Sequence, residues 1–77
     1  SLNIRIFSDK DKSMAFNRQL YGNTGKATCP KCNDNTKLFD FNQMEADHIV
    51  AWSKGGKTNL ANCQMLCRYH NGMKSGN

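Results

Sequence analysis

The chain has 77 residues, and its 11 lysines and arginines outnumber its 6 aspartates and glutamates, giving a net charge of +5. A chain of this length buries only about 60% of the surface that its unfolded form exposes, so its core needs support from a disulfide, a metal or a partner. It has no run near the ~18 apolar residues of a membrane span and no signal-peptide pattern. We therefore expect a small cytoplasmic domain, whose positive charge suits a phosphate backbone but fits a merely soluble surface as well.

The first predicted element is a helix over residues 9–21. Ser8, with Asp11 three residues later, matches a capping box, and Gly22 is suited to end the helix. The apolar residues of this run form one loose face, which indicates a packing helix without a role in chemistry. Residues 23–34 follow as a turn region rich in Gly, Asn and Thr, and they carry a C-x-x-C pair.

Short extended runs and loops make up the rest of the chain. The predicted order is a strand at 36–41, a strand at 44–52, a glycine loop at 53–58, a helical turn at 59–63 capped by Thr58, a strand at 64–68 and a terminal helix that starts at 69–71. Strands followed by a helix, with a metal-type pair on each side, predict a small α+β domain.

Four residues form two matched metal-binding half-sites, Cys29-x-x-Cys32 and Cys67-x-x-His70. A C-x-x-C turn directs both thiolates at one ion, and two such half-sites complete a zinc tetrahedron. In a reducing compartment this spacing favours a metal over disulfides. We therefore predict a structural Zn²⁺ that joins the start of the core to its end.

The remaining cysteine, Cys63, leaves a second ligand set open. In that set four thiolates bind the zinc, and His70 is available for other work. The match between the two half-sites favours His70 as the ligand and a buried, apolar role for Cys63. Zinc content measured after Cys63→Ala and after His70→Ala would separate the two sets.

The run EADHIVAWSKGGKTNLANCQMLCRYHNGMKSGN (45–77), preceded by CPKCN (29–33), resembles the HNH endonucleases, or ββα-metal nucleases. It is similar to the zinc-containing branch found in restriction enzymes, phage proteins and mobile-element proteins. Ala51 replaces a frequent proline, Cys63 replaces an aliphatic residue, and Asn71 stands where other members have histidine. The resemblance implies a ββα-metal, treble-clef-like core behind an N-terminal helix, and it suggests a bacterial or phage origin.

The resemblance also assigns catalytic roles to His48, Asp47, Asn62 and Asn71. His48 would be the general base, because an unperturbed histidine has a pKa of about 6.5. Asp47 and Asn71 would offer oxygen ligands to a catalytic Mg²⁺ or Mn²⁺, and Asn62 would brace the loop that holds His48. Neighbouring strand side chains point to opposite faces, so Asp47 and His48 can share a site only where the strand bends or ends. Taken singly, each of the four also fits an ordinary structural role.

The expected substrate is double-stranded DNA, cut to leave 5′-phosphate and 3′-hydroxyl ends. Its backbone could contact Lys54, Lys57, Arg68 and Lys74, although these residues fit a solvated surface as well. Two alternatives stay open: a zinc-stabilised nucleic-acid-binding module without activity, and a structural or protein-interaction zinc domain.

The expected organisation is a single HNH nuclease domain over residues 1–77. A helical extension would occupy residues 1–28, and a zinc-stapled ββα-metal core would occupy residues 29–77. We expect the domain to belong to a longer protein, in which a further domain would supply target specificity. A dimer or a second event would make the cut in the second strand.

Overall fold

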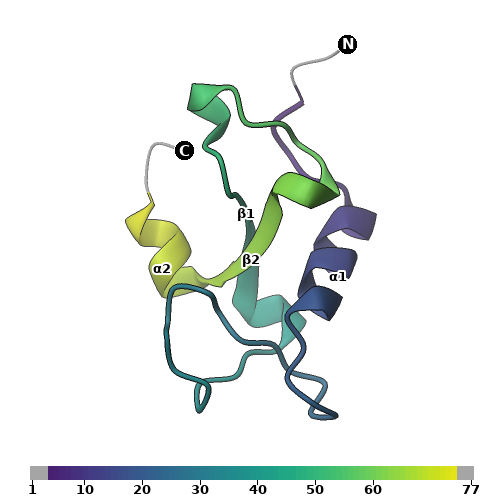
Figure 1. Ribbon diagram of the computed structural model, residues 1–77, viewed down its shortest axis with the longest axis vertical. Coiled ribbons are helices and arrows are strands. Elements are labelled where there is room, and N and C mark those ends of the chain that lie inside the picture. The colour runs from purple at the N-terminus through teal and green to yellow at the C-terminus, as the bar shows by residue number, and fades with distance from the viewer. Residues whose placement is uncertain (1–3, 75–77) are drawn as a thin grey trace.

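The structure is a computed structural model that describes residues 4–74, so the outermost residues of the predicted extension and core lie outside the described part. Figure 1 shows two strands in the middle of the molecule, with one α-helix on each side. The elements in chain order are α1 (Asp9–Arg18), the 3-10 turn η1 (Phe41–Gln43), β1 (Met44–His48), the 3-10 turns η2 (Trp52–Lys54) and η3 (Leu60–Asn62), β2 (Cys63–Cys67) and α2 (Arg68–Met73).

The two strands and α2 form a ββα unit. β1 and β2 pair in antiparallel fashion, with Met44 opposite Cys67 and His48 opposite Cys63. α2 follows β2 without a loop, because Cys67 ends the strand and Arg68 begins the helix. The small α+β class and the ββα core predicted from the sequence are confirmed.

The start of α1 follows from its capping residue. Ser8 Oγ accepts a hydrogen bond from the backbone nitrogen of Asp11 at 3.1 Å, as the sequence pattern predicted. The helix ends at Arg18, before the predicted end at residue 21. Gly22 does adopt a left-handed backbone (φ 53°), but it lies in the turn beyond the helix.

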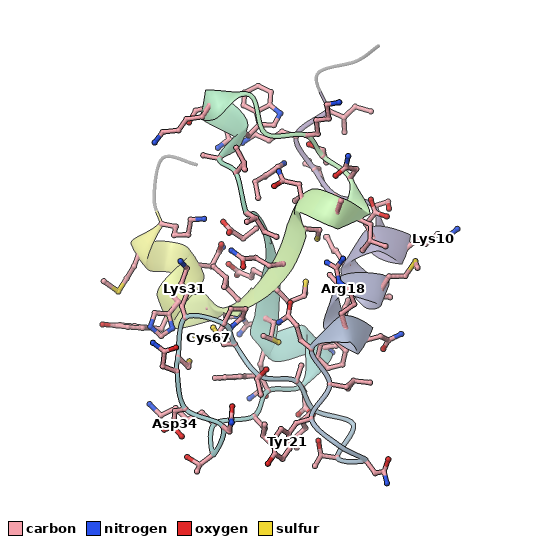
Figure 2. All side chains as sticks on the ribbon, viewed as in Figure 1. Lys10, Arg18, Tyr21, Lys31, Asp34 and Cys67 are labelled. Atoms are coloured by element: carbon pink, nitrogen blue, oxygen red, sulfur yellow. The ribbon has the colours of Figure 1, made fainter. Side chains whose placement is uncertain are left out.

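The last residue of α1 and the residue after it cover the outer edge of β2. Arg18, which extends from α1 in Figure 2, donates from Nη2 to the Cys63 carbonyl at 2.6 Å. Gln19 donates to the Met65 carbonyl and accepts from the Met65 nitrogen, both at 2.9 Å. An unpaired strand edge would otherwise expose these backbone groups, so the end of α1 completes the sheet on that side.

The predicted strand over residues 36–41 is wrong. Within this run Phe39 makes a single bridge to Ala27, with hydrogen bonds of 2.9 Å in both directions. Asp34 Oδ1 accepts bonds from the backbone nitrogen and the hydroxyl of Thr36, at 2.9 and 2.6 Å. These local side-chain bonds stabilise a turn in place of an extended strand.

The predicted strand over residues 44–52 is too long, because β1 ends at His48. The prediction that Thr58 caps the next helical turn is also wrong. Asn59 takes that position instead, since its side chain accepts from the Asn62 nitrogen at 3.1 Å at the start of η3. Thr58 is thereby available for a contact with His48.

One hydrophobic core joins most parts of the described chain, although α2 contributes no buried residue to it. Its buried residues come from the N-terminal segment, α1, the turn region and both strands: Phe7, Ala15, Phe16, Ala27, Cys29, Met44, Cys63, Met65, Leu66 and Cys67. The predicted extension and the predicted core therefore pack as one unit. Between residues 4 and 74, no helix is long and apolar enough to cross a membrane.

Candidate metal centre and active site

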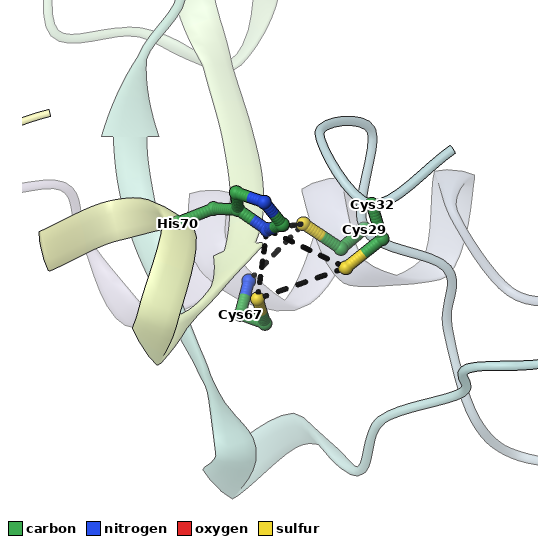
Figure 3. A group of neighbouring side chains, drawn as sticks. All are labelled: Cys29, Cys32, Cys67 and His70. Atoms are coloured by element: carbon green, nitrogen blue, oxygen red, sulfur yellow. Dashed lines mark hydrogen bonds between the residues drawn. The ribbon is translucent and has the colours of Figure 1, made fainter. Parts of the chain in front are cut away.

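Four side chains from two distant parts of the chain meet beside α2. Cys29 and Cys32 come from the turn region, Cys67 ends β2, and His70 lies in α2; Figure 3 shows their ligand atoms facing one another. These atoms all lie within 4.8 Å of one another. The sequence-predicted quartet is therefore assembled in the fold.

The separations inside this Cys3His cluster match a zinc site. His70 Nδ1 lies 3.2 Å from Cys67 Sγ and 3.5 Å from Cys32 Sγ, and the sulfurs of Cys32 and Cys67 are 3.8 Å apart. Zinc bonds of about 2.3 Å to sulfur and 2.0 Å to nitrogen, at tetrahedral angles, require ligand atoms roughly 3.5–3.8 Å apart. The cluster thus has the donor set and the dimensions to hold Zn²⁺.

The thiols of the cluster need a cation if all are to ionise. Burial by itself would raise the pKa of Cys29, but hydrogen bonds from the backbones of Cys67 and Lys31 outweigh it and hold that pKa below its usual value. Burial and the neighbouring thiols of Cys29 and Cys67 raise the pKa of Cys32 to about 12. Zinc would offset the repulsion among the three thiolates.

Cys63 lies apart from the Cys3His cluster. Its side chain is 0% exposed, and burial raises the pKa of its thiol to about 11. Among residues 4–74, the geometry groups His70 and not Cys63 with the other three cysteines. This arrangement agrees with the preference for a histidine ligand over a fourth thiolate.

A second set of polar side chains lines a cavity of about 620 Å³ along β1. Asp47 and His48, at the end of β1, and Asn71, on α2, all contribute to its wall. The strand ends at His48, which is the condition under which two adjacent strand residues can serve one site. We call this the β1 cavity.

Asp47 is held by Gln64 and Lys74. Its Oδ2 accepts a hydrogen bond of 2.8 Å from Gln64, which lies directly opposite in the sheet. The same oxygen forms an ion pair with Lys74 Nζ, also at 2.8 Å. Lys74 also donates to the His48 carbonyl at 3.2 Å. The carboxylate is only 3% exposed. Lys74, predicted as a DNA contact, therefore links the end of α2 to the Asp47–His48 pair.

His48 is held on two sides. Its Nε2 lies 2.9 Å from the Thr58 hydroxyl, and its ring packs against Phe7, with centroids 4.3 Å apart and planes inclined by 38°. Burial lowers the pKa of His48; the nearby Asp47 opposes this, and the cations Arg5 and Lys74 reinforce it. The net effect favours a neutral imidazole.

Asn62 braces the loop between β1 and β2. Its Oδ1 accepts from the Val50 nitrogen at 2.8 Å, while its Nδ2 donates to the carbonyls of Val50 and Lys57 at 3.1 and 2.8 Å. Asn62 is not among the residues that line the β1 cavity. Its contacts match the predicted bracing role, in which it holds the loop beside His48.

The backbone conformation and packing of that loop require its two glycines. Gly55 adopts φ +88°, a left-handed conformation that favours glycine. A Cβ at Gly56 would lie 1.7 Å from the Val50 carbonyl oxygen. Close packing within the chain therefore explains the glycine at position 56.

Asn71 projects from α2 towards β1. Its Nδ2 donates to Glu45 Oε1 at 2.6 Å, and Glu45 also lies on the wall of the β1 cavity. Arg68, one helical turn earlier, lies 3.9 Å from Glu45 Oε2 and donates to the Asn42 carbonyl at 2.6 Å.

The remaining predicted DNA contacts, Lys54 and Lys57, are exposed in the loop after β1. Arg5 and Lys12, which the sequence analysis did not single out, line the β1 cavity together with Lys74. The Arg5 guanidinium lies over the Trp52 ring, 5.2 Å from its centroid. The wall of the cavity therefore carries positive charge from the N-terminal segment, from α1 and from the end of α2.

A protein-family model of the HNH endonucleases matches residues 29–76, more than half of the chain. The chain belongs to the HNH endonuclease family. The matched region of this HNH domain contains both halves of the Cys3His cluster and all four sequence-predicted catalytic residues. No curated protein and no solved structure matched the chain. The family resemblance inferred from the motif is thereby confirmed.

Four residues that contact the catalytic side chains were not predicted from the sequence to do so: Glu45, Gln64, Thr58 and Phe7. The period of two along a strand could have found Glu45, which lies on the same face as Asp47. The others had no local signal, because the strand register, the loop and the N-terminal segment bring them to the motif only in the folded domain.

Proposed function

We propose that this domain is a metal-dependent DNA endonuclease of the HNH type, with His48 as general base and one divalent cation held by Asp47 and Asn71. The observation that carries the proposal is that these three side chains line one cavity, at the end of β1 and on α2. Membership of the HNH endonuclease family supports the same chemistry.

The donor set fits a hard divalent cation. Asp47 offers a carboxylate oxygen and Asn71 an amide oxygen, and Mg²⁺ and Mn²⁺ both prefer oxygen ligands. Two protein ligands leave coordination positions for substrate oxygens and water. When bound, such a cation would offset the negative charge that develops on the phosphate and on the leaving oxygen.

His48 supplies the proton chemistry. Its Nε2–H can donate to the Thr58 hydroxyl, which leaves the Nδ1 lone pair to take a proton from the attacking water. The water oxygen bonds to phosphorus as the bond to the 3′ oxygen breaks, and that oxygen takes up a proton. The products are a 5′-phosphate and a 3′-hydroxyl. Because burial lowers the pKa of His48, the ring can accept a proton at neutral pH.

The Cys3His cluster has a separate, structural role in this proposal. Zn²⁺ bound by four protein ligands would have no open position for chemistry. It would instead tie the turn region to the end of β2 and to α2, which carries Asn71. We further propose one nuclease domain over residues 1–77, with an extension at 1–28 and a zinc-stapled core at 29–77. Its thiols suit a reducing compartment such as the cytoplasm.

Double-stranded DNA is the proposed substrate, and one site would cut one strand. Arg5, Lys12 and Lys74 at the β1 cavity could hold the backbone at the cut. Lys54 and Lys57 in the exposed loop and Arg68 at the start of α2 could hold the flanking phosphates. A double-strand break would then require a second copy or a second event.

A plasmid-nicking assay tests the proposal. Supercoiled DNA is incubated with the zinc-loaded domain in Mg²⁺ or Mn²⁺, with and without a chelator. His48→Ala, purified in parallel, controls for contaminating nucleases. We expect metal-dependent nicking by the wild type and a loss of about 10²–10⁴-fold in His48→Ala, with zinc content and amide spectrum retained.

Two outcomes would contradict the proposal. Equal cleavage by His48→Ala and the wild type would show that His48 is not the base. If the wild type shifts DNA in a gel but cleaves it in neither metal, the domain is a zinc-stabilised binding module and not a nuclease.

A further inference from the structure

The hydrogen bond between Asn71 and Glu45 fixes which end of the amide faces which way. The two atoms, Asn71 Nδ2 and Glu45 Oε1, are 2.6 Å apart. An ionised carboxylate can only accept hydrogen bonds, so the amide must present its NH₂ group to Glu45. The other end of the same amide, Oδ1, is therefore turned away from Glu45.

This orientation matters because the two ends of an asparagine amide are opposite in character. Oδ1 can bind a cation, whereas the NH₂ group carries partial positive charge and only donates. An amide without a fixed partner can rotate by half a turn and exchange the two ends. A single strong acceptor on the nitrogen side removes that freedom, and charge-assisted hydrogen bonds are the strong ones.

Glu45 is placed for this role by the strand. It lies two residues before Asp47 on β1, so both carboxylates project from the same face. Glu45, Asp47 and Asn71 all line the β1 cavity. Arg68 makes a loose ion pair with the other carboxylate oxygen of Glu45, because its guanidinium lies 3.9 Å from Oε2. Oε1 is thus left to the amide of Asn71.

We propose that Glu45 is a positioning residue that orients Asn71, so that the amide oxygen and not the amide nitrogen is presented to the divalent cation. The inference rests on the proposed function, in which Asn71 is a ligand. Glu45 would act through its hydrogen bond and would not itself bind the cation. Removing such an indirect partner from a metal site typically weakens metal binding by about 10–100-fold.

Binding of Mn²⁺ to the zinc-loaded domain, followed by electron paramagnetic resonance without DNA, tests the inference. Glu45→Ala should weaken Mn²⁺ binding by about 10–100-fold. Glu45→Gln keeps an acceptor oxygen at the same reach without the charge, so it should retain most of the affinity. Asp34→Asn, which removes one carboxylate outside the cavity wall, should leave the affinity unchanged.

A second pair of variants asks whether Glu45 acts through Asn71. In an Asn71→Ala background, Glu45→Ala should cause no further loss of Mn²⁺ affinity, because the group that it orients is gone. In the zinc-loaded wild type without Mn²⁺, the side-chain NH₂ signals of Asn71 should carry the downfield shift of a strong hydrogen bond. That shift should disappear in Glu45→Ala and persist in Glu45→Gln.

The outcomes separate this inference from the proposed function. If Asp47→Ala and Asn71→Ala leave Mn²⁺ binding unchanged, the cation site itself is wrong. If those variants lose Mn²⁺ but Glu45→Ala does not, only the role of Glu45 is wrong. Equal losses in Glu45→Gln and Glu45→Ala would mean that Glu45 acts by its charge or as a direct ligand, which also overturns the inference.

Discussion

The Cys3His cluster and the β1 cavity differ in which groups their polar side chains contact. In the cluster the four ligand atoms face one another, and all lie within 4.8 Å of one another. In the cavity each polar group is held by a neighbour outside the catalytic set: Asp47 by Gln64 and Lys74, His48 by Thr58, and Asn71 by Glu45.

This difference distinguishes a closed centre from an open one. A structural zinc site uses all of its positions for protein ligands, so no position is left for a substrate. A site that must admit a substrate keeps positions open, and its few ligands are oriented by surrounding residues. Changes to the protein that affect one centre and spare the other therefore test the assignment of each centre.

Removal of zinc should have the largest effect. Structural zinc in small domains contributes about 10–16 kcal/mol of binding free energy at neutral pH, comparable to or larger than the stability of a whole domain. We expect Cys67→Ala, or a strong chelator, to unfold the chain, as seen by circular dichroism and loss of amide dispersion. Cys63→Ala is the matched control and should remain folded with one zinc. Unfolding of both variants, or of neither, would contradict the ligand set.

The next largest effect is expected from a substitution of Gly56, in the loop beside the β1 cavity. Gly56→Ala would force a methyl group against the Val50 carbonyl, which lies 1.7 Å from the Cβ position. Overpacking of this kind costs about 1–3 kcal/mol, measured by denaturant unfolding. Gly72→Ala, in α2 with open space around its Cβ, should stabilise the domain by about 0.5–1 kcal/mol. Zinc should stay bound in both, and its loss from Gly56→Ala would show that the two centres are not independent.

A smaller effect is expected at Thr58. Thr58→Val keeps the shape of the side chain but removes the hydroxyl that faces His48 Nε2. A hydrogen bond of about 1 kcal/mol corresponds to roughly fivefold in kcat, measured by single-turnover nicking. Thr58→Ser should restore most of the rate. A valine variant as active as the wild type would show that the hydroxyl does not orient the base.

The smallest effect concerns pH. His48 must be neutral to take a proton, and burial lowers its pKa. Cleavage should therefore persist below the ordinary histidine pKa of about 6.5 and fall only at more acidic pH. Phe7→Ala exposes the ring, raises this pKa towards its ordinary value and should move the acid limb of kcat/KM to higher pH. An unchanged acid limb would assign it to another group.

Much of the closed centre could be predicted from the sequence, because its ligands follow local rules. Cys29-x-x-Cys32 is fixed by a tight turn and Cys67-x-x-His70 by the first turn of α2, and their meeting required only that β2 and α2 approach the turn region. The start of α1 was equally local, since Ser8 caps the helix through its own neighbour Asp11.

The partners in the open centre could not be read in this way. Gln64 meets Asp47 through the register of β1 and β2, and Phe7 meets His48 through the packing of the N-terminal segment. Thr58 was taken for a cap because local chemistry allowed it, and Asn59 took that position instead. The strand predicted at 36–41 failed for a related reason, since side-chain bonds at Asp34 favoured a turn.

The central claim is that His70 and Asn71, adjacent in α2, belong to different metal centres. The most direct measurement is zinc content after dialysis against a chelator, for His70→Ala and Asn71→Ala side by side. The account predicts that His70→Ala loses its zinc and that Asn71→Ala keeps one zinc per chain. Zinc retained by His70→Ala, or lost from Asn71→Ala, would contradict it.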